Sequence, residues 1–164
     1  MLDAYFDIET TGLSWFDSEI TVVGLYLVNG DVNRLVQLVG KEVTGDNLID
    51  ALRDVRTIFT YNGSRFDLPF INAVLGVDMA GLIGHHDLMY DCWSCNLYGG
   101  FKAVEQQLDI PRQLKGISGL DAVMLWWKYR NHGDQNALDL LLRYNREDVT
   151  NLKVLRERLG GKQI

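Results

Sequence analysis

The sequence predicts an α/β fold in which helices flank a mixed five-stranded sheet. Segments rich in β-branched and aromatic residues dominate the first half of the chain, and helical patterns dominate the second half. The chain has 164 residues, 47% of them hydrophobic, which is enough for one sizeable core. With only 2 prolines and no low-complexity stretch, no linker is visible, so we expect a single domain over residues 1–164.

Hydrophobic periodicity and turn residues place the expected elements. Strands are expected at residues 2–9, 19–28, 32–39, 57–61 and 85–89. Helices are expected at residues 47–55, 65–75, 91–97, 101–108, 119–130 and 135–159. Pro69 is compatible with its helix if it lies in the first turn, and Gly160 and Gly161 end the last helix.

The charge distribution differs between the two parts of the chain. A net charge of -6 is unusual for a protein that binds nucleic acid. However, residues 1–99 contain 5 basic and 14 acidic side chains, whereas residues 100–164 contain 11 basic and 8 acidic ones. The basic second part is therefore the expected contact surface for a polyanion.

The same composition argues against several classes of protein. Residues 1–28 contain five acidic side chains, so this stretch resembles neither a signal peptide nor a membrane span. Two cysteines do not form a disulfide framework, which favours a reducing compartment. We expect a cytoplasmic protein.

Two acids lie close together in the first predicted strand. Alternation along a strand places Asp7, Glu9 and Tyr5 on one face of the sheet. Phe6 and Ile8 then face the opposite way. Two carboxylates at one spot beside apolar neighbours repel each other, so they need a cation or a shared proton. Oxygen ligands favour Mg²⁺ or Mn²⁺ over Zn²⁺. The alternative, that Asp7 and Glu9 simply lie at a solvated strand end, explains the pair equally well.

Two further acids accompany ordinary structural signals. Asp67 follows a glycine turn and opens a predicted helix, where an acid is also favoured as a helix cap. Asp148 lies one turn after Tyr144 on the last predicted helix, so the two side chains share a face. Each acid alone has a structural explanation, and only their combination points to chemistry.

That combination resembles a known family. The segments YFDIETTGL, NGSRFD and YNRED, in this order, resemble the three motifs of the DEDD 3′-5′ exonucleases, which have the ribonuclease H-like fold. The C-terminal part, through LLRYNRED, is similar to the YprB-like ribonuclease H-like domains. Tyr144 lies four residues before Asp148, as in the tyrosine subtype (DEDDy), and none of the 3 histidines has the spacing of the histidine subtype.

The resemblance implies a two-metal hydrolysis of phosphodiester bonds at the 3′ end of single-stranded DNA or RNA. The expected ligands of two Mg²⁺ or Mn²⁺ ions are Asp7, Glu9, Asp67 and Asp148. Asp7 would bridge the ions, and Asp67 would serve the second ion through water. Tyr144 would orient the attacking water, because a phenol with a pKa of about 10 is a poor base unless a metal or arginine lowers that pKa.

The resemblance also implies contacts with the terminal nucleotide. The turn after the first strand would approach it, with Leu13 between bases, and Phe66 would offer an aromatic face. Lys102 follows two glycines at a predicted helix start, where a phosphate could bind. The expected substrate-binding residues are Thr10, Thr11, Gly12, Leu13, Asn62, Phe66 and Lys102. A plain turn or local packing is the alternative for each.

Other conspicuous side chains have structural explanations. Cys92 and Cys95 form a lone Cys-x-x-Cys, and we expect them on a buried helix face rather than in a zinc or redox site. Trp126, Trp127 and Tyr129 are expected in the core rather than against bases.

Two alternative functions remain open at this point. The chain could be a non-catalytic nucleic-acid-binding module on the same fold, although the loss of a carboxylate would be the signature of such a module. It could also be an RNA-processing ribonuclease. The sequence does not distinguish DNA from RNA, because that choice depends on contacts with the 2′ position.

Overall fold

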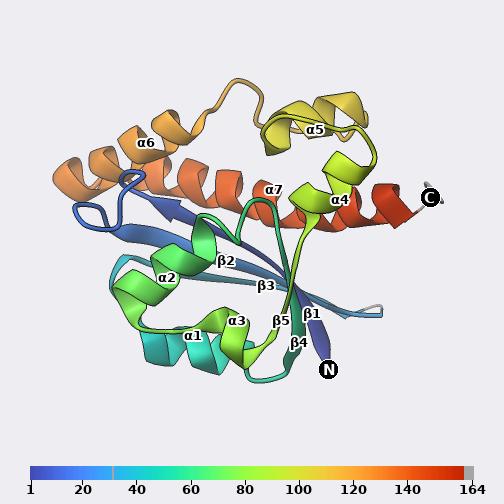
Figure 1. Cartoon of the computed structure of the whole chain (residues 1–164). Coiled ribbons are helices and arrows are strands. Elements are labelled where there is room, and N and C mark those ends of the chain that lie inside the picture. The colour runs from blue at the N-terminus through green and yellow to red at the C-terminus, as the bar shows by residue number, and fades with distance from the viewer. Residues whose placement is uncertain (31, 161–164) are drawn as a thin grey trace.

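The computed structural model describes residues 1–30 and 32–160, and it confirms the α/β prediction (Figure 1). The strands are β1 (Leu2–Thr10), β2 (Ile20–Asn29), β3 (Val32–Val39), β4 (Val55–Thr60) and β5 (Gly84–Asp87). The helices are the 3₁₀ turn η1 (Gly40–Glu42) and α1 (Gly45–Leu52), α2 (Asp67–Leu75), α3 (Met79–Leu82), α4 (Leu88–Ser94), α5 (Phe101–Gln107), α6 (Gly119–His132) and α7 (Gln135–Gly160).

The sheet is mixed, with the strand order β3-β2-β1-β4-β5. Strands β1, β2 and β3 are antiparallel neighbours, whereas β4 is parallel to β1 and β5 is parallel to β4. Parallel strands end at the same edge of a sheet. The acids at the end of β1 and the turn after β4 therefore meet at one edge.

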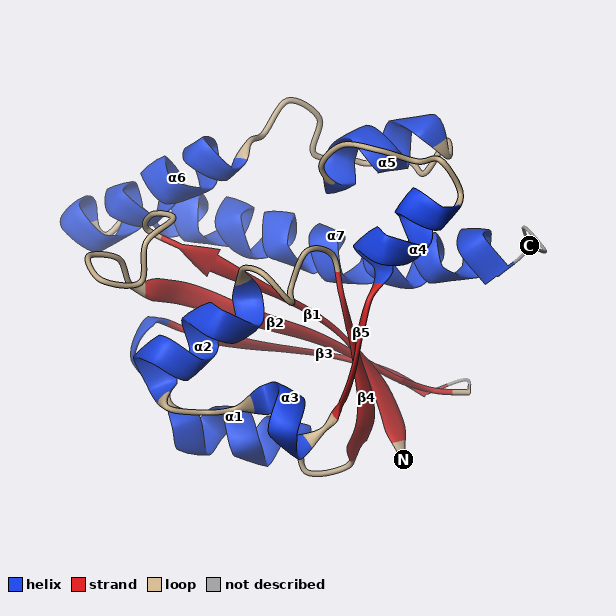
Figure 2. Cartoon of the chain, in the orientation of Figure 1, coloured by secondary structure: helices blue, strands red, loops and turns tan. Residues whose placement is uncertain are grey.

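Helices cover both faces of this sheet (Figure 2). On one face, α1, α2 and α3 pack over a core that includes Phe6, Leu25 and Phe70. On the other face, α4, α5 and α7 enclose a second core around Val149 and Leu155. Helices α6 and α7 share a third cluster beside β2. Each face of β1 is thus buried, and the two sets of alternating side chains enter different environments.

The alternation predicted for β1 is confirmed. Phe6 and Ile8 belong to the core under α1, α2 and α3, and Tyr5 belongs to the core under α7. Asp7 and Glu9 lie on the α7 side, where the Asn145 side chain approaches both of them. The alternation of side chains along β1 therefore places its apolar core residues on one face of the sheet and its carboxylates on the other.

Some element boundaries differ from the prediction. The strand expected at 57–61 begins at Val55, and the strand expected at 85–89 ends at Asp87, because Asp87 caps α4 through the backbone N–H of Met89. The expected helix at 65–75 begins at Asp67, so Pro69 does lie in its first turn. Two short elements, η1 and α3, were not predicted, since four residues or fewer carry little periodicity.

The conspicuous side chains outside the motifs are mostly structural, as expected. Cys92 is buried in the α4 core and Cys95 packs partly against it. Trp126 is buried between α6 and α7, and Tyr129 packs against the same cluster. The prediction for Trp127 is wrong, because its side chain is 41% exposed on the outer side of α6. Within the described ranges, no helix is long and apolar enough to cross a bilayer.

Helix α7 lies close against β2, and Gly24 makes this contact possible. Gly24 pairs with Asp7 across the sheet, and the Asn145 side chain passes directly over it toward β1. A Cβ atom at residue 24 would come within 3.0 Å of three Asn145 side-chain atoms. The missing side chain of Gly24 therefore creates the space through which α7 reaches the carboxylates.

We predict that Gly24→Ala lowers the free energy of unfolding by roughly 1–3 kcal/mol, because the added methyl group overpacks the α7 contact. Urea denaturation measures this change. Gly119→Ala is the matched control, since a Cβ atom there meets nothing within 4 Å. Equal stability of the two variants would contradict the packing role assigned to Gly24.

Candidate active site

Three carboxylates from two distant segments converge at one edge of the sheet. Asp7 and Glu9 come from β1, and Asp148 comes from α7. One ligand oxygen from each lies within 4.8 Å of the other two. Glu9 and Asp148 are buried and Asp7 is partly exposed. This is the only group of three or more potential metal ligands among residues 1–30 and 32–160.

Burial and mutual repulsion oppose ionisation of these carboxylates. Burial, followed by the charges of Glu9, Asp148 and Asp67, raises the pKa of Asp7 well above its usual value. Burial and the Asp148 charge raise the pKa of Glu9 to about 8. Burial also raises the pKa of Asp148, although Arg112 and Lys102 oppose this effect. A bound cation would remove the repulsion, so the cluster has the electrostatic character of a cation site.

Asp67 lies beside this cluster and makes a different contact. It is the first residue of α2, and its Oδ1 atom accepts a hydrogen bond of 3.1 Å from the backbone N–H of Ile8. This bond ties the turn after β4 to β1 between the two acids of the first motif. Burial raises the pKa of Asp67 to about 7, against the lowering effect of its backbone hydrogen bonds. Asp67 is not part of the compact group of three ligands.

Tyr144 lies one turn before Asp148 on the buried face of α7. Its hydroxyl oxygen accepts a hydrogen bond of 2.5 Å from Nζ of Lys102, and the ammonium lies 4.5 Å from the centre of the tyrosine ring. Burial, followed by the nearby carboxylates, raises the pKa of Tyr144, and the opposing effect of Arg112 is smaller. The neighbouring cations therefore do not bring the pKa of Tyr144 below its usual value, and the phenol stays protonated at neutral pH.

Three residues of the site were missed by the sequence analysis. Asn145 is fully buried, and its amide nitrogen lies 3.4 Å from Asp7 Oδ2 and 3.5 Å from Glu9 Oε1. Arg112 forms an ion pair of 2.5 Å with Asp148, and Glu105 holds the same guanidinium. Asn145 is the second residue of the YNRED motif, so the sequence did contain a signal that could have identified it. Arg112 and Glu105 lie outside the motifs, and only the folded structure brings them next to Asp148.

The turn after β4 is held by Asp87 at the end of β5. The Asp87 carboxylate accepts hydrogen bonds from the backbone N–H groups of Asn62 and Ser64, at 2.8 and 3.0 Å, and from the Ser64 hydroxyl group. Asn62 has φ of 62°, in the left-handed region that asparagine tolerates well. Asp87 thereby fixes the loop that carries Phe66 and Asp67.

An apolar pocket of about 440 Å³ opens next to the carboxylates. Its lining includes Glu9, the turn of residues 10–13, Phe66 and, from α6, Leu120. Thr10 and Thr11 shape the turn by hydrogen bonds with the backbone of Gly12 and Glu19. Leu13 is 86% exposed at the rim of this pocket. The structure thus gathers the predicted turn residues and Phe66 around one cavity, whereas Asn62 and Lys102 do not line it.

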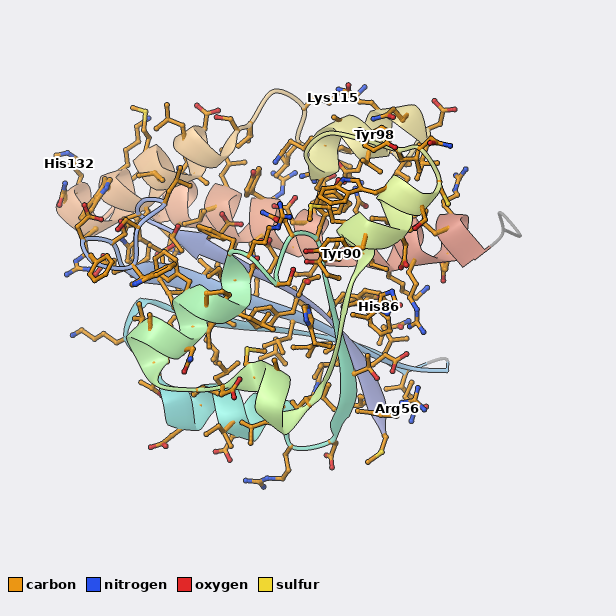
Figure 3. All side chains as sticks on the ribbon, in the orientation of Figure 1. Arg56, His86, Tyr90, Tyr98, Lys115 and His132 are labelled. Carbon is orange, nitrogen blue, oxygen red and sulfur yellow. The ribbon has the colours of Figure 1, made fainter. Side chains whose placement is uncertain are left out.

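The histidines take no part in the carboxylate group. His85 bonds Thr60, and His86 forms a 2.5 Å pair with Asp91. Figure 3 shows His86 beside α4 and His132 at the far end of α6. The structure therefore places Tyr144, and no histidine, beside Asp148.

A model of the RNase_H superfamily matches residues 4–160. The chain belongs to the ribonuclease H superfamily. No curated protein matches the sequence. Membership in this superfamily supports a nucleic-acid-cleaving activity.

Two solved structures share the fold of this superfamily member. One is a family B DNA polymerase from the hyperthermophilic archaeon Pyrobaculum calidifontis, with a TM-score of 0.74 and 18% identity over 97% of this chain. This chain spans only 24% of that polymerase. The other is a nuclease in its apo form, with a TM-score of 0.62 and 21% identity, covering 98% of this chain and 72% of that one. At these identities the likeness shows the fold alone.

We predict that the metal-free protein loses stability as the pH rises from about 4.5 to about 8. The pKa of Glu9 is about 8 in the folded protein and 4.5 in its unperturbed state. The folded state therefore holds this proton more tightly, so the stabilisation is complete below the lower value and disappears above the higher one. Urea denaturation in the presence of a chelator measures the trend.

The variant Glu9→Gln is the control for this pH dependence, because its amide cannot titrate. Its stability should vary less between pH 4.5 and 8 than that of the wild type. A wild-type stability that rises with pH over this interval would contradict the electrostatic description of the cluster.

Proposed function

We propose that the protein is a metal-dependent 3′-5′ exonuclease that hydrolyses phosphodiester bonds at the 3′ end of single-stranded DNA or RNA. In this proposal Asp7, Glu9 and Asp148, assisted by Asp67, hold two Mg²⁺ or Mn²⁺ ions. The proposal includes the tyrosine (DEDDy) subtype, similarity to the YprB-like domains and a cytoplasmic location.

The observation that carries the proposal is the convergence of three carboxylates with Tyr144 directly beside them. The donor set fits Mg²⁺ or Mn²⁺, because all its atoms are hard oxygens, and a bound cation would offset the burial and the repulsion that raise the pKa values of Asp7 and Glu9. When bound, two such ions would activate the attacking water and stabilise the leaving oxygen.

Residues of the chain would bind the ions and orient the attacking water. Asp7, the partly exposed member of the group, would bridge the ions, with Glu9 and Asp148 on the side of the attacking water. Asp67, held by the Ile8 amide, would bind the second ion through water. Tyr144 would keep its proton and orient the water by a hydrogen bond, while Lys102 fixes the phenol oxygen.

The apolar pocket would receive the terminal nucleotide. Its lining includes Glu9, Phe66 and Leu120, so a terminal base held against these side chains would keep the phosphodiester bond on its 5′ side, which links it to the preceding nucleotide, near the carboxylates. Leu13, exposed at the rim, would separate the terminal base from the next one. The nucleotide would also contact the turn and the loop after β4 through Thr10, Thr11, Gly12 and Asn62. An unstacked 3′ end fits such a pocket better than a duplex does.

We predict that Asp7→Ala or Asp148→Ala abolishes stepwise shortening of a 5′-labelled single strand, because each change removes a metal ligand. The assay compares DNA and RNA oligonucleotides with Mg²⁺ or Mn²⁺ on a denaturing gel. Asp50→Ala, at an exposed site on α1, is the control and should retain wild-type activity. Binding of the strand without shortening by the wild type would instead support the non-catalytic module, and internal cleavage would support an RNA-processing ribonuclease.

We predict that Tyr144→Phe lowers the turnover rate by about 10²-fold, because the variant loses the hydrogen bond that orients the attacking water. Tyr129→Phe is the matched control, because Tyr129 packs on α6 outside the carboxylate cluster. Single-turnover rates measure both variants. An unchanged rate in Tyr144→Phe would remove the phenol from the proposed mechanism.

A further inference from the structure

Arg112 is a buried cation that contacts the carboxylate cluster from outside the sequence motifs. It lies in the segment between α5 and α6, and its side chain is only 10% exposed. Its Nη2 atom is 2.5 Å from Asp148 Oδ1, and its Nε and Nη2 atoms are 2.8 and 2.9 Å from the two oxygens of Glu105. One guanidinium therefore joins two carboxylates.

The two carboxylate partners of Arg112 differ in their surroundings. Glu105 is 2% exposed, makes the two-bonded contact with the guanidinium and also accepts a hydrogen bond of 2.8 Å from Asn151. Asp148 makes a single bond with Arg112 and belongs to the group of potential metal ligands, from which Glu105 is absent. Glu105 thus fixes the position of Arg112. Asp148 is the partner of Arg112 that could also bind a metal ion.

The guanidinium is also incompletely satisfied. Its third nitrogen, Nη1, is the one buried side-chain nitrogen or oxygen atom in the described ranges without a hydrogen-bond partner. Buried donors in a purely structural ion pair are normally all bonded. Because Nε and Nη2 both bond Glu105, the guanidinium can give up its single bond to Asp148 without losing its contact with Glu105.

We propose that Arg112 is a positioning residue that holds Asp148 in the metal-free protein and releases it when a divalent ion binds. This inference rests on the proposed metal site. Arg112 compensates the charge of Asp148 while the site is free of metal, because an unpaired carboxylate in this cluster would be costly. The same contact competes with the ion for Asp148, so Arg112 weakens metal binding.

The competition can be separated from simple charge effects. The double variant Arg112→Gln/Glu105→Gln removes one positive and one negative charge, so the net charge is unchanged. The amide oxygen that Glu105→Gln introduces would still accept the hydrogen bond from Asn151. Tighter metal binding by this variant would therefore report the release of Asp148. Arg112→Lys is a second variant that keeps the positive charge but loses the planar two-bonded contact.

The test is a titration of each folded protein with Mn²⁺, in which electron paramagnetic resonance measures the free ion. We expect the dissociation constant to fall by roughly threefold or more in the double variant, and by a smaller factor in Arg112→Lys, because one hydrogen bond to a charged group is the contact that competes. Arg56→Gln is the matched control, since Arg56 lies at the start of β4 and pairs at 3.1 Å with Asp3 at the start of β1, and it is not among the partners of Asp148. Its constant should equal that of the wild type.

The outcomes distinguish this inference from the proposed function. If the wild type binds Mn²⁺ and both Arg112 variants bind it equally well or more weakly, Arg112 does not compete for Asp148 and the inference is overturned. If the wild type binds no Mn²⁺, the metal site of the proposed function fails as well. Circular dichroism verifies that each variant is folded before the titration.

Discussion

The repulsion among carboxylates held between β1 and α7 is the constraint on which the rest of the site depends. Asp7, Glu9 and Asp148 are close enough to share one cation, and burial raises the pKa of each. A cluster of this kind disfavours its own ionised state. The fold must therefore hold the acids together by contacts other than those that the acids make with one another.

Packing around α7 supplies those contacts. Apolar residues on its buried face, including Leu141 and Val149, fix the helix against the sheet. Gly24 lets the helix approach, and Asn145 crosses the gap toward both acids of β1. Asp67 adds a bond from α2 to β1. Hydrophobic burial and backbone bonds thus offset the electrostatic cost of the cluster.

Positive charge reaches the cluster from the basic second part of the chain. Lys102 contacts Tyr144, and Arg112 contacts Asp148, so both cations lie beside the carboxylate cluster. In the proposed function Lys102 fixes the phenol oxygen of Tyr144, whereas Arg112 holds Asp148 while the site is free of metal. The basic second part of the chain therefore supplies the cations that lie beside the cluster.

The sequence by itself determined the strand that carries Asp7 and Glu9, the helix face shared by Tyr144 and Asp148, and the α/β class, because these follow from local periodicity. Only the tertiary structure decided that Arg112 pairs with Asp148. The same holds for the route of α7 over Gly24, for the pocket that joins Phe66 to α6, and for the raised pKa of Tyr144. Such contacts join residues far apart in the chain and depend on burial, which no local pattern encodes.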